Sequence, residues 1–245
     1  MDFVRARRRL SCAVVATAMF TAAMFTAAML MAAAPTMVRA TDNSPRVALV
    51  AVGATSGPAT AAAQARLTKL GFWTGAANGA YGFATFQAVM AFQKYFSLPP
   101  TGRLDQATVD QLNTVSERAR GVHHEGTWVE VDKAKQLVFI VVKGETLWTL
   151  NTSTGSGVTN SEFGAAVTPN GLWKVKRERP VGWWRGELGE LYRPKYFSGN
   201  VAIHGSNSVP KRAASHGCVR LSVEAMDFIW AHDLIPIATK IWVHD

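Results

Sequence analysis

Cysteine is almost absent from this sequence, which has only Cys12 and Cys218 among its 245 residues. Cys12 lies in an N-terminal segment that we expect to be removed, so the mature chain would keep one cysteine. A chain with a single cysteine cannot form an internal disulfide. In an exported protein, a lone thiol is expected to be reactive or to pair with another molecule. Cys218 is therefore the residue whose presence needs an explanation.

Runs of positive charge are also missing beyond the N-terminus. The formal net charge is +9, but residues 1–40 hold five arginines and one aspartate, which leaves +5 for residues 41–245. Nucleic-acid-binding proteins gather such charge on one face or in one run. The scattered excess argues against nucleic acid as a partner and supports only a weak attraction to an anionic envelope surface.

The N-terminus has the order of an export signal. A basic segment, MDFVRARRRL, is followed by a long run of apolar and small residues and then by VRA before Thr41. This order predicts a signal peptide over residues 1–40, with cleavage after Ala40. Because the apolar run is long, an uncleaved membrane anchor is the alternative. Either way, the protein is expected to be exported to the periplasm or the extracytoplasmic cell wall.

Residues 41–59 are predicted to be a linker, and helical periodicity begins at about residue 60. Leu67 and Leu70 lie on one helical stripe, and Gly71 ends that helix. A second apolar stripe runs through residues 83–96, and Asp105 is placed to cap a short third helix. The pattern predicts three short helices over residues 60–115.

This stretch resembles the small three-helix peptidoglycan-binding domain. The resemblance depends mainly on core and turn positions, among them Leu70-Gly71-Phe72, Asn78-Gly79, Tyr81-Gly82, Thr101-Gly102 and Asp105. Asn78 stands where the family more often has aspartate. The resemblance implies that residues 60–115 bind the glycan wall, and a spacer domain without binding is the alternative.

From residue 127 the hydrophobic period changes from helical to two. Residues 116–126 read as a polar linker, in which His123 and His124 are taken as solvated residues. Leu137 to Val142 is a continuous apolar run, as expected of a strand covered on both faces. One clear helix follows Ser222, a plausible N-cap. Residues 127–245 are therefore expected to form a mainly β, sandwich-like domain with one or two helices, which makes the protein a two-domain chain.

The segment around Cys218 contains the parts needed for acyl transfer. A free thiol has a pKa of about 8.5, so a nearby imidazole or cation is needed to raise the thiolate fraction at neutral pH. Two histidines qualify, His216 and His204, and the nearer one is favoured by local sequence alone. Ser215 offers an orienting hydroxyl, and Gly217 lets its own amide and that of Cys218 converge on an oxyanion.

The pattern IHGS followed by SHGCVR resembles the signature of the L,D-transpeptidase catalytic domain. The TPNG of residues 168–171 and the run YFSGNVAIHG also match, so the resemblance covers about residues 127–244. It implies Cys218 as nucleophile and His204, not His216, as base, with Ser215 and His216 supporting that histidine. The residues expected to meet substrate are Arg220, Gly205, Tyr196 and Trp184, and bracing of the loop is the alternative for Arg220. The aromatic residues between the motifs could line a lid over the donor peptide or pack on a sheet edge; they are Trp183, Trp184, Tyr192 and Tyr196.

In such enzymes the cysteine attacks the diaminopimelate carbonyl of a peptidoglycan tetrapeptide stem and expels the terminal D-alanine. An amine of a second stem or another amine, or water, then resolves the thioester. The resemblance therefore implies stem peptides as donor and acceptor, no metal or organic cofactor, and a monomeric enzyme.

The same residues allow four other interpretations. His204, His216 and Cys218 could hold a metal, although a fourth ligand is not evident and zinc would quench the thiol. The chain could be a non-catalytic envelope-binding protein, or an L,D-carboxypeptidase that uses water. A papain-like endopeptidase is disfavoured because His204 precedes Cys218 in the chain.

The short linker also carries an expectation about the two domains. A tether of about ten polar residues would hold the bound wall close to the active site. Deleting residues 41–120 is therefore expected to leave the chemistry on soluble muropeptides nearly unchanged, to weaken retention on intact sacculi and to slow their crosslinking.

Overall fold

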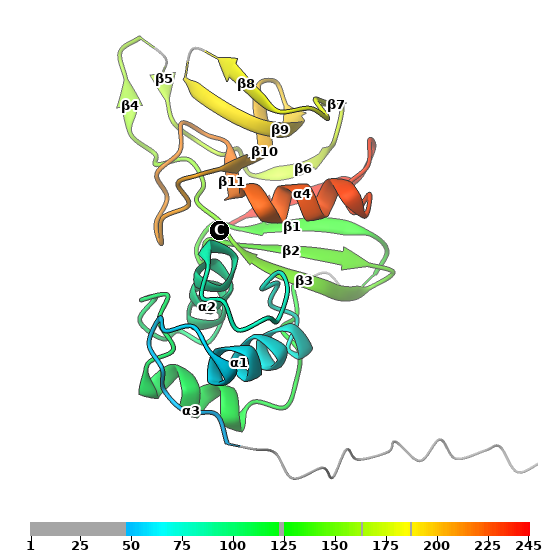
Figure 1. Ribbon diagram of the computed structural model, residues 1–245. Coiled ribbons are helices and arrows are strands. Elements are labelled where there is room, and N and C mark those ends of the chain that lie inside the picture. The colour runs from blue at the N-terminus through cyan, green and yellow to red at the C-terminus, as the bar shows by residue number, and fades with distance from the viewer. Residues whose placement is uncertain (1–47, 123–124, 163, 187) are drawn as a thin grey trace, which may run out of the picture. The chain divides into compact units, whose positions relative to one another are not determined.

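The computed structural model describes residues 48–245 except 123, 124, 163 and 187 (Figure 1). The predicted export signal, residues 41–47 of the first linker and the His123–His124 pair therefore lie outside the described residues. Among the described residues, no helix has the length and apolarity needed to cross a membrane.

The first part of the described chain is the predicted three-helix unit. Its helices are α1 (Pro58–Lys69), α2 (Phe83–Tyr95) and α3 (Gln106–Thr114). Asp105 caps α3 as predicted, because its carboxylate accepts a hydrogen bond from the Thr108 amide at 3.0 Å. Gly71 follows α1 with a φ of +89°, a conformation that favours glycine. Leu67, Phe72 and Phe92 lie in the buried core of this unit.

The second part consists of two five-stranded sheets and one small ribbon, as predicted for a mainly β domain. In one sheet the order is β3-β2-β1-β12-β6; in the other it is β11-β10-β9-β7, with β8 also paired to β9; β4 and β5 form the ribbon. The strands are β1 (Trp128–Asp132), β2 (Leu137–Val142), β3 (Glu145–Asn151), β4 (Thr159–Asn160), β5 (Gly164–Ala165), β6 (Gly171–Lys174), β7 (Arg177–Glu178), β8 (Trp183–Gly186), β9 (Gly189–Ser198), β10 (Val201–Ser206), β11 (Val219–Ser222) and β12 (Lys240–His244).

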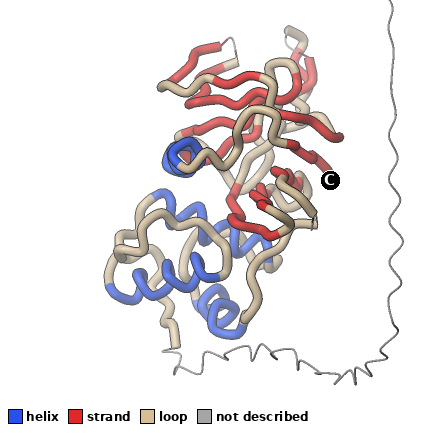
Figure 2. The backbone as a smooth tube through the Cα atoms, turned by 90° about the vertical axis from the view of Figure 1, so that its right-hand side faces the viewer, coloured by secondary structure: helices blue, strands red, loops and turns tan. Residues whose placement is uncertain are grey.

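The one α-helix described in this part is α4 (Val223–Ala231), which follows β11 directly. Ser222 caps it as predicted, since its hydroxyl accepts a hydrogen bond from the Ala225 amide. Figure 2 shows the helices of the first part gathered apart from the strands, with α4 lying among the strands. Met226 and Ile229 of α4 are buried in a core that also contains residues of both sheets.

Strand β2 is covered on both faces, as its continuous apolar sequence predicts. Val138 and Ile140 point into the core between the two sheets. Leu137, Phe139 and Val141 alternate with them and pack into the core of the helical unit instead. The helical unit and the β domain therefore share a continuous apolar interface, and the polar linker is not their only connection.

Candidate active site

Strand register brings the predicted residues to one face of the second sheet. β10 and β11 run parallel, with Ile203 opposite Val219 and His204 opposite Arg220. Because alternate residues point to opposite faces, Ile203 and Val219 enter the core, while His204, Cys218 and Arg220 share the other face. β9 adds Tyr196 to that face opposite Ala202, and β7 adds Arg177 opposite Tyr196.

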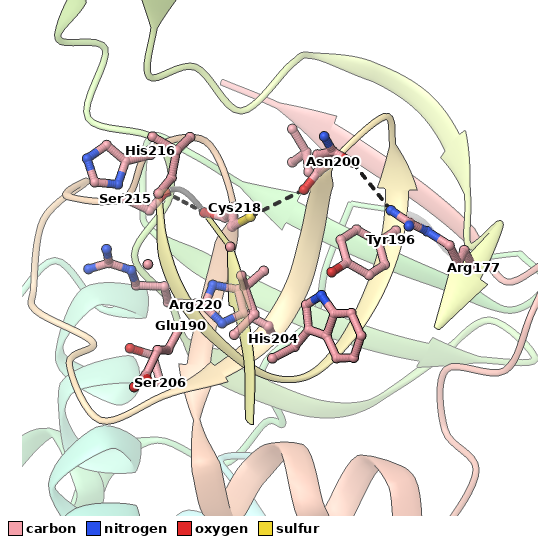
Figure 3. A pocket seen from close by; sticks show the side chains of 16 residues that line it. Arg177, Glu190, Tyr196, Asn200, His204, Ser206, Ser215, His216, Cys218 and Arg220 are labelled. Atoms are coloured by element: carbon pink, nitrogen blue, oxygen red, sulfur yellow. Dashed lines mark hydrogen bonds between the residues drawn. The ribbon is translucent and has the colours of Figure 1, made fainter. Parts of the chain in front are cut away.

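This face forms one wall of a cavity of about 490 Å³ (Figure 3). The predicted residues that line it are Trp184, Tyr196, His204, Ser215, His216, Cys218 and Arg220. Residues that sequence reasoning did not single out also line it, notably Arg177, Glu190, Leu188 and Asn200. They belong to β7, to the β8–β9 hairpin and to the turn before β10. The turns and edges that bring them here carry no chemical motif in the sequence.

His204 is 4% exposed, and its orientation is fixed by the backbone. Its Nδ1 lies 2.8 Å from the carbonyl oxygen of Gly205. A carbonyl can only accept, so Nδ1 carries the proton and donates, and Nε2 keeps its lone pair. Burial lowers the pKa of His204 to about 4, and the nearby Arg220 lowers it further, while the bond to Gly205 opposes the shift. His204 is therefore a neutral base at neutral pH.

Gly205, expected to meet substrate, does not line the cavity. Its carbonyl orients His204, and its α-carbon faces the interior. A Cβ at this position would lie 2.9 Å from the ring of Tyr192 and 3.2 Å from Met226. Glycine is required here because of close packing beneath the strand, and the expected contact with substrate is replaced by a role in holding the histidine.

Cys218 is partly exposed and stands immediately before β11. Its sulfur accepts a hydrogen bond from the Ala202 amide at 3.4 Å and lies 3.8 Å from the Asn200 carbonyl oxygen. Burial raises the pKa of the Cys218 thiol, against the Ala202 bond and the Arg220 charge, which lower it. The resting pair is therefore a neutral thiol and a neutral imidazole.

Ser215 has a different role from the expected support of His204. Its hydroxyl donates to the Cys218 carbonyl at 2.5 Å and accepts from the Gly217 amide at 3.0 Å. These two bonds close a tight turn over residues 215–218. Because the Gly217 amide already has a partner, the predicted pair of free oxyanion donors is not present in the resting structure. His216 is exposed and lies between the main cavity and a neighbouring hollow of about 270 Å³.

Thr168 of the TPNG segment holds the same turn from outside. Its buried hydroxyl donates to the Gly217 carbonyl at 2.6 Å and accepts from the Gly155 amide at 2.9 Å. Gly217 has a φ of +127°, and a Cβ there would lie 2.9 Å from the Val167 carbonyl oxygen. The sequence marked this segment only as a turn and as part of a resemblance; the link between residues 168 and 217 requires the tertiary fold.

The cavity has more positive than negative side chains. Arg220 on β11 and Arg177 on β7 lie at opposite ends of the strand order, and Figure 3 shows them on opposite sides of Cys218. The Arg177 guanidinium stacks 4.0 Å above the Tyr196 ring, and Glu190 is bound by Arg185 at 2.8 Å. A ligand with carboxylates on both sides of its reacting carbonyl would suit this distribution.

The predicted aromatic lid divides into two pairs. Trp184 and Tyr196 line the cavity. Trp183 and Tyr192 are cross-strand partners whose ring centroids lie 5.1 Å apart, and the Tyr192 hydroxyl donates to Asp227 of α4 at 2.9 Å. Alternation along β8 separates Trp183 from Trp184. Tyr192 and Tyr196 are four residues apart and are separated by the register shift between β9 and β10, where β9 has one extra residue between its pairings with Ile203 and Gly205.

The metal hypothesis has no geometric support in the described chain. Among residues 48–245, apart from the four that the structure leaves out, no group of three or more histidine, cysteine, aspartate or glutamate side chains is placed to hold a metal ion.

Comparison with known proteins agrees with the resemblance. Residues 126–243 match the L,D-transpeptidase catalytic domain family, and residues 56–112 match the peptidoglycan binding domain family. No curated protein sequence matches.

Two solved structures of L,D-transpeptidases are similar to this chain, and the first extends the match across both parts. An L,D-transpeptidase from Xylanimonas cellulosilytica is 37% identical, with a TM-score of 0.72 over 82% of this chain and 99% of that one. One from Stackebrandtia nassauensis is 19% identical, with a TM-score of 0.46 over 80% and 94%. The first of these, together with the two domain matches, shows that the chain belongs to the L,D-transpeptidase family, with a peptidoglycan-binding domain preceding the catalytic one.

Proposed function

We propose that this protein is a cysteine-dependent L,D-transpeptidase that acts on peptidoglycan tetrapeptide stems through a thioester. The observation that carries the proposal is the arrangement of Cys218 and His204. They lie on one face of the same sheet and in one cavity, and the proton on Nδ1 of His204 leaves Nε2 free to accept another.

In the first step, the Cys218 sulfur attacks the carbonyl of the third residue of the donor stem. His204 Nε2 takes the thiol proton, and the carbonyl oxygen becomes an oxyanion. The bond to the terminal D-alanine then breaks, and its amine leaves with the proton from His204. The Cys218 amide is one donor for the oxyanion. The Gly217 amide could join it by exchanging the Ser215 hydroxyl for the substrate oxygen.

In the second step, an amine attacks the thioester, His204 removes its proton, and the Cys218 sulfur leaves as thiol. A new amide bond joins acceptor to donor. If water replaces the amine, the same residues make the enzyme an L,D-carboxypeptidase, so the acceptor decides the activity.

The charges of the cavity support a donor of this kind. A stem peptide carries free carboxylates beyond the scissile bond and on its side chains, and Arg177 and Arg220 lie on opposite sides of Cys218. Arg220 is half-buried, and burial lowers the pKa of its guanidinium. A carboxylate would therefore gain more from pairing with it than at an exposed site.

The helical unit supports binding to the wall itself, and both domains favour an extracytoplasmic place of action. The enzyme is proposed to work as a monomer, with the glycan wall held through residues 60–115. The mild positive charge should make this retention depend on salt. Sacculus binding by the full-length Cys218→Ala protein at low and high salt measures both effects without turnover.

The decisive experiment is mass spectrometry of the purified protein with a disaccharide-tetrapeptide. We expect an acyl-enzyme on Cys218, loss of D-alanine, and a cross-linked or hydrolysed product. Cys218→Ala should stay folded and give neither adduct nor product. Wild-type turnover by that variant would contradict the cysteine mechanism, and binding without any turnover by the wild type would favour a non-catalytic envelope protein.

A further inference from the structure

The helical unit contacts the segment that joins the two candidate catalytic residues. This segment, residues 207–218, runs from the end of β10 to the start of β11 without regular secondary structure. Helix α2 packs against β2, β3 and β11, the strand that follows Cys218. The domain expected to bind the wall therefore also lies against the frame of the active site.

A buried amide network crosses this interface. Gln87 on α2 donates from Nε2 to the carbonyl of Val209 at 3.2 Å, and its Oε1 accepts from Asn151 on β3 at 2.5 Å. Gln87, Asn151 and Val209 are at most 7% exposed. Asn151 also lies 3.4 Å from the Val209 carbonyl, and Lys94 on α2 donates to Asn151 at 2.5 Å.

Buried polar groups are costly when unpaired, so these bonds fix the position of the Val209 carbonyl. The other end of the segment is fixed from the β domain. The amides of Ala214 and Ser215 both donate to the Thr154 carbonyl at 2.9 Å, and the Ser153 hydroxyl donates to the Arg212 carbonyl at 2.8 Å. The helical unit thus supplies one of two anchors for the segment that sets Cys218 relative to His204.

We propose that Gln87 is a positioning residue for catalysis, and that the helical unit acts as part of the catalytic frame in addition to any role in wall binding. The inference rests on the proposed function for the identity of the reacting pair. Gln87 acts through the Val209 carbonyl and touches no reacting atom.

The test compares Gln87→Met with a matched control, Gln64→Met, in the full-length protein. Gln64 on α1 is also buried. Its side-chain amide donates to the Ala80 carbonyl and the Thr85 hydroxyl and accepts from the Gly79 amide. Both variants lose a buried amide of the helical unit, but the described bonds of Gln64 stay within that unit. Melting temperatures of both are measured first, so that activities are compared below either transition.

We expect Gln87→Met to lower kcat on a soluble tetrapeptide by roughly tenfold or more, since small misplacements of reacting groups cost this much. Its KM should stay within about twofold of the wild-type value, because the change affects the alignment of the reacting groups in the transition state and not the binding of substrate. The pH profile of alkylation at the Cys218 peptide should also shift. Gln64→Met should keep kcat and the alkylation profile of the wild type. A purely structural role would lower the melting temperature and leave the kcat and alkylation profile of the folded fraction unchanged.

Two results would overturn the inference: equal losses of kcat in both variants at equal folded fraction, or a Gln87→Met protein with wild-type kcat and alkylation. Failure of the proposed function is distinguishable. If the wild type transfers no acyl group but alkylation at Cys218 still differs between the two variants, the positioning stands and the assigned reaction falls.

Discussion

At the scale of single residues, the position of the proton on the His204 ring determines which ring nitrogen is free to accept another. With Nδ1 bound to the Gly205 carbonyl, Nε2 is the base of the proposed mechanism, and the raised pKa of the thiol means that this mechanism requires the proton to move during attack. His216 is exposed, and its ring has no such hydrogen bond to a backbone carbonyl among the described residues. The two histidines should therefore differ in effect when removed.

We expect His204→Ala to slow acylation by roughly a hundredfold or more, the range for loss of a general base. His216→Ala should lose less, because its side chain lies at the rim between two hollows. Single-turnover acylation, followed by intact-protein mass spectrometry, checks both. A His216→Ala protein with the larger defect would transfer the role of base to His216.

The pH profile of kcat/KM follows from the same pair. The pKa of His204 is lowered to about 4, so the imidazole stays neutral as pH falls from 7 and is protonated only near pH 4. The raised thiol pKa moves the alkaline limit upward. Activity should therefore hold across the neutral range and be lost only as pH falls toward about 4. An acid limb at the ordinary histidine pKa of about 6.5 would contradict this expectation. The acid and alkaline limbs report the titration of the Cys218–His204 pair as a unit.

The turn of residues 215–218 is the element that positions Cys218, the proposed nucleophile. It is closed from within by Ser215 and held from outside by Thr168. None of these three hydrogen bonds belongs to regular secondary structure, so the turn relies on the two side chains.

Replacing Thr168 by valine keeps the shape of the side chain and removes both of its hydrogen bonds. The Gly217 carbonyl and the Gly155 amide would be left buried, at a cost of about 1–3 kcal/mol in unfolding free energy. We expect a lower kcat as well, because the turn carries Cys218. Urea unfolding and steady-state kinetics measure the two effects.

Thr149→Val is the matched control for this change. Thr149 is fully buried, and its hydroxyl has no hydrogen-bond partner among the described residues. Removing an unsatisfied hydroxyl should leave stability unchanged or raise it, with activity unaffected. Equal losses in the two valine variants would show that the Thr168 bonds contribute nothing specific.

The shared interface governs the molecule as a whole. Leu137, Phe139 and Val141 of β2 are buried against the helical unit. The ring centroid of Trp73 in that unit lies 5.2 Å from the ring centroid of Phe228 in α4. The two parts bury apolar surface that each would expose alone. The helical unit and the β domain are therefore connected by this interface as well as by the linker predicted over residues 116–126.

Deleting residues 41–120 is therefore expected to destabilise the catalytic part. Exposing three large side chains costs about 1.5–3 kcal/mol each, which approaches the whole stability of an ordinary domain of about 5–15 kcal/mol. The truncated protein should aggregate or show a much lower melting temperature, and should lose activity on soluble muropeptides. A chain beginning at residue 41 is the control. A stable truncated protein with full activity would show that the β domain folds and acts without the helical unit.

Local patterns were sufficient for much of the fold and part of the site. The Asp105 and Ser222 caps, the three helices and the doubly covered strand β2 follow from spacing and residue type, because these features depend on near neighbours. The grouping of His204, Cys218 and Arg220 also followed from a short motif. The roles of Arg177, Thr168 and Gln87 could not be found this way, since their partners lie 13 to 122 positions away in the chain.

The sequence by itself determined the family, through the motif that contains His204 and Cys218, and the presence of a helical and a β part, through a change of hydrophobic period. Tertiary structure decided the rest. In the folded chain the Ser215 hydroxyl bonds within its own turn, and the Gly205 carbonyl bonds the His204 ring. A buried hydrogen-bond network connects the helical and β parts. These are outcomes of which buried polar group finds which partner, and that choice is made only when distant segments pack together.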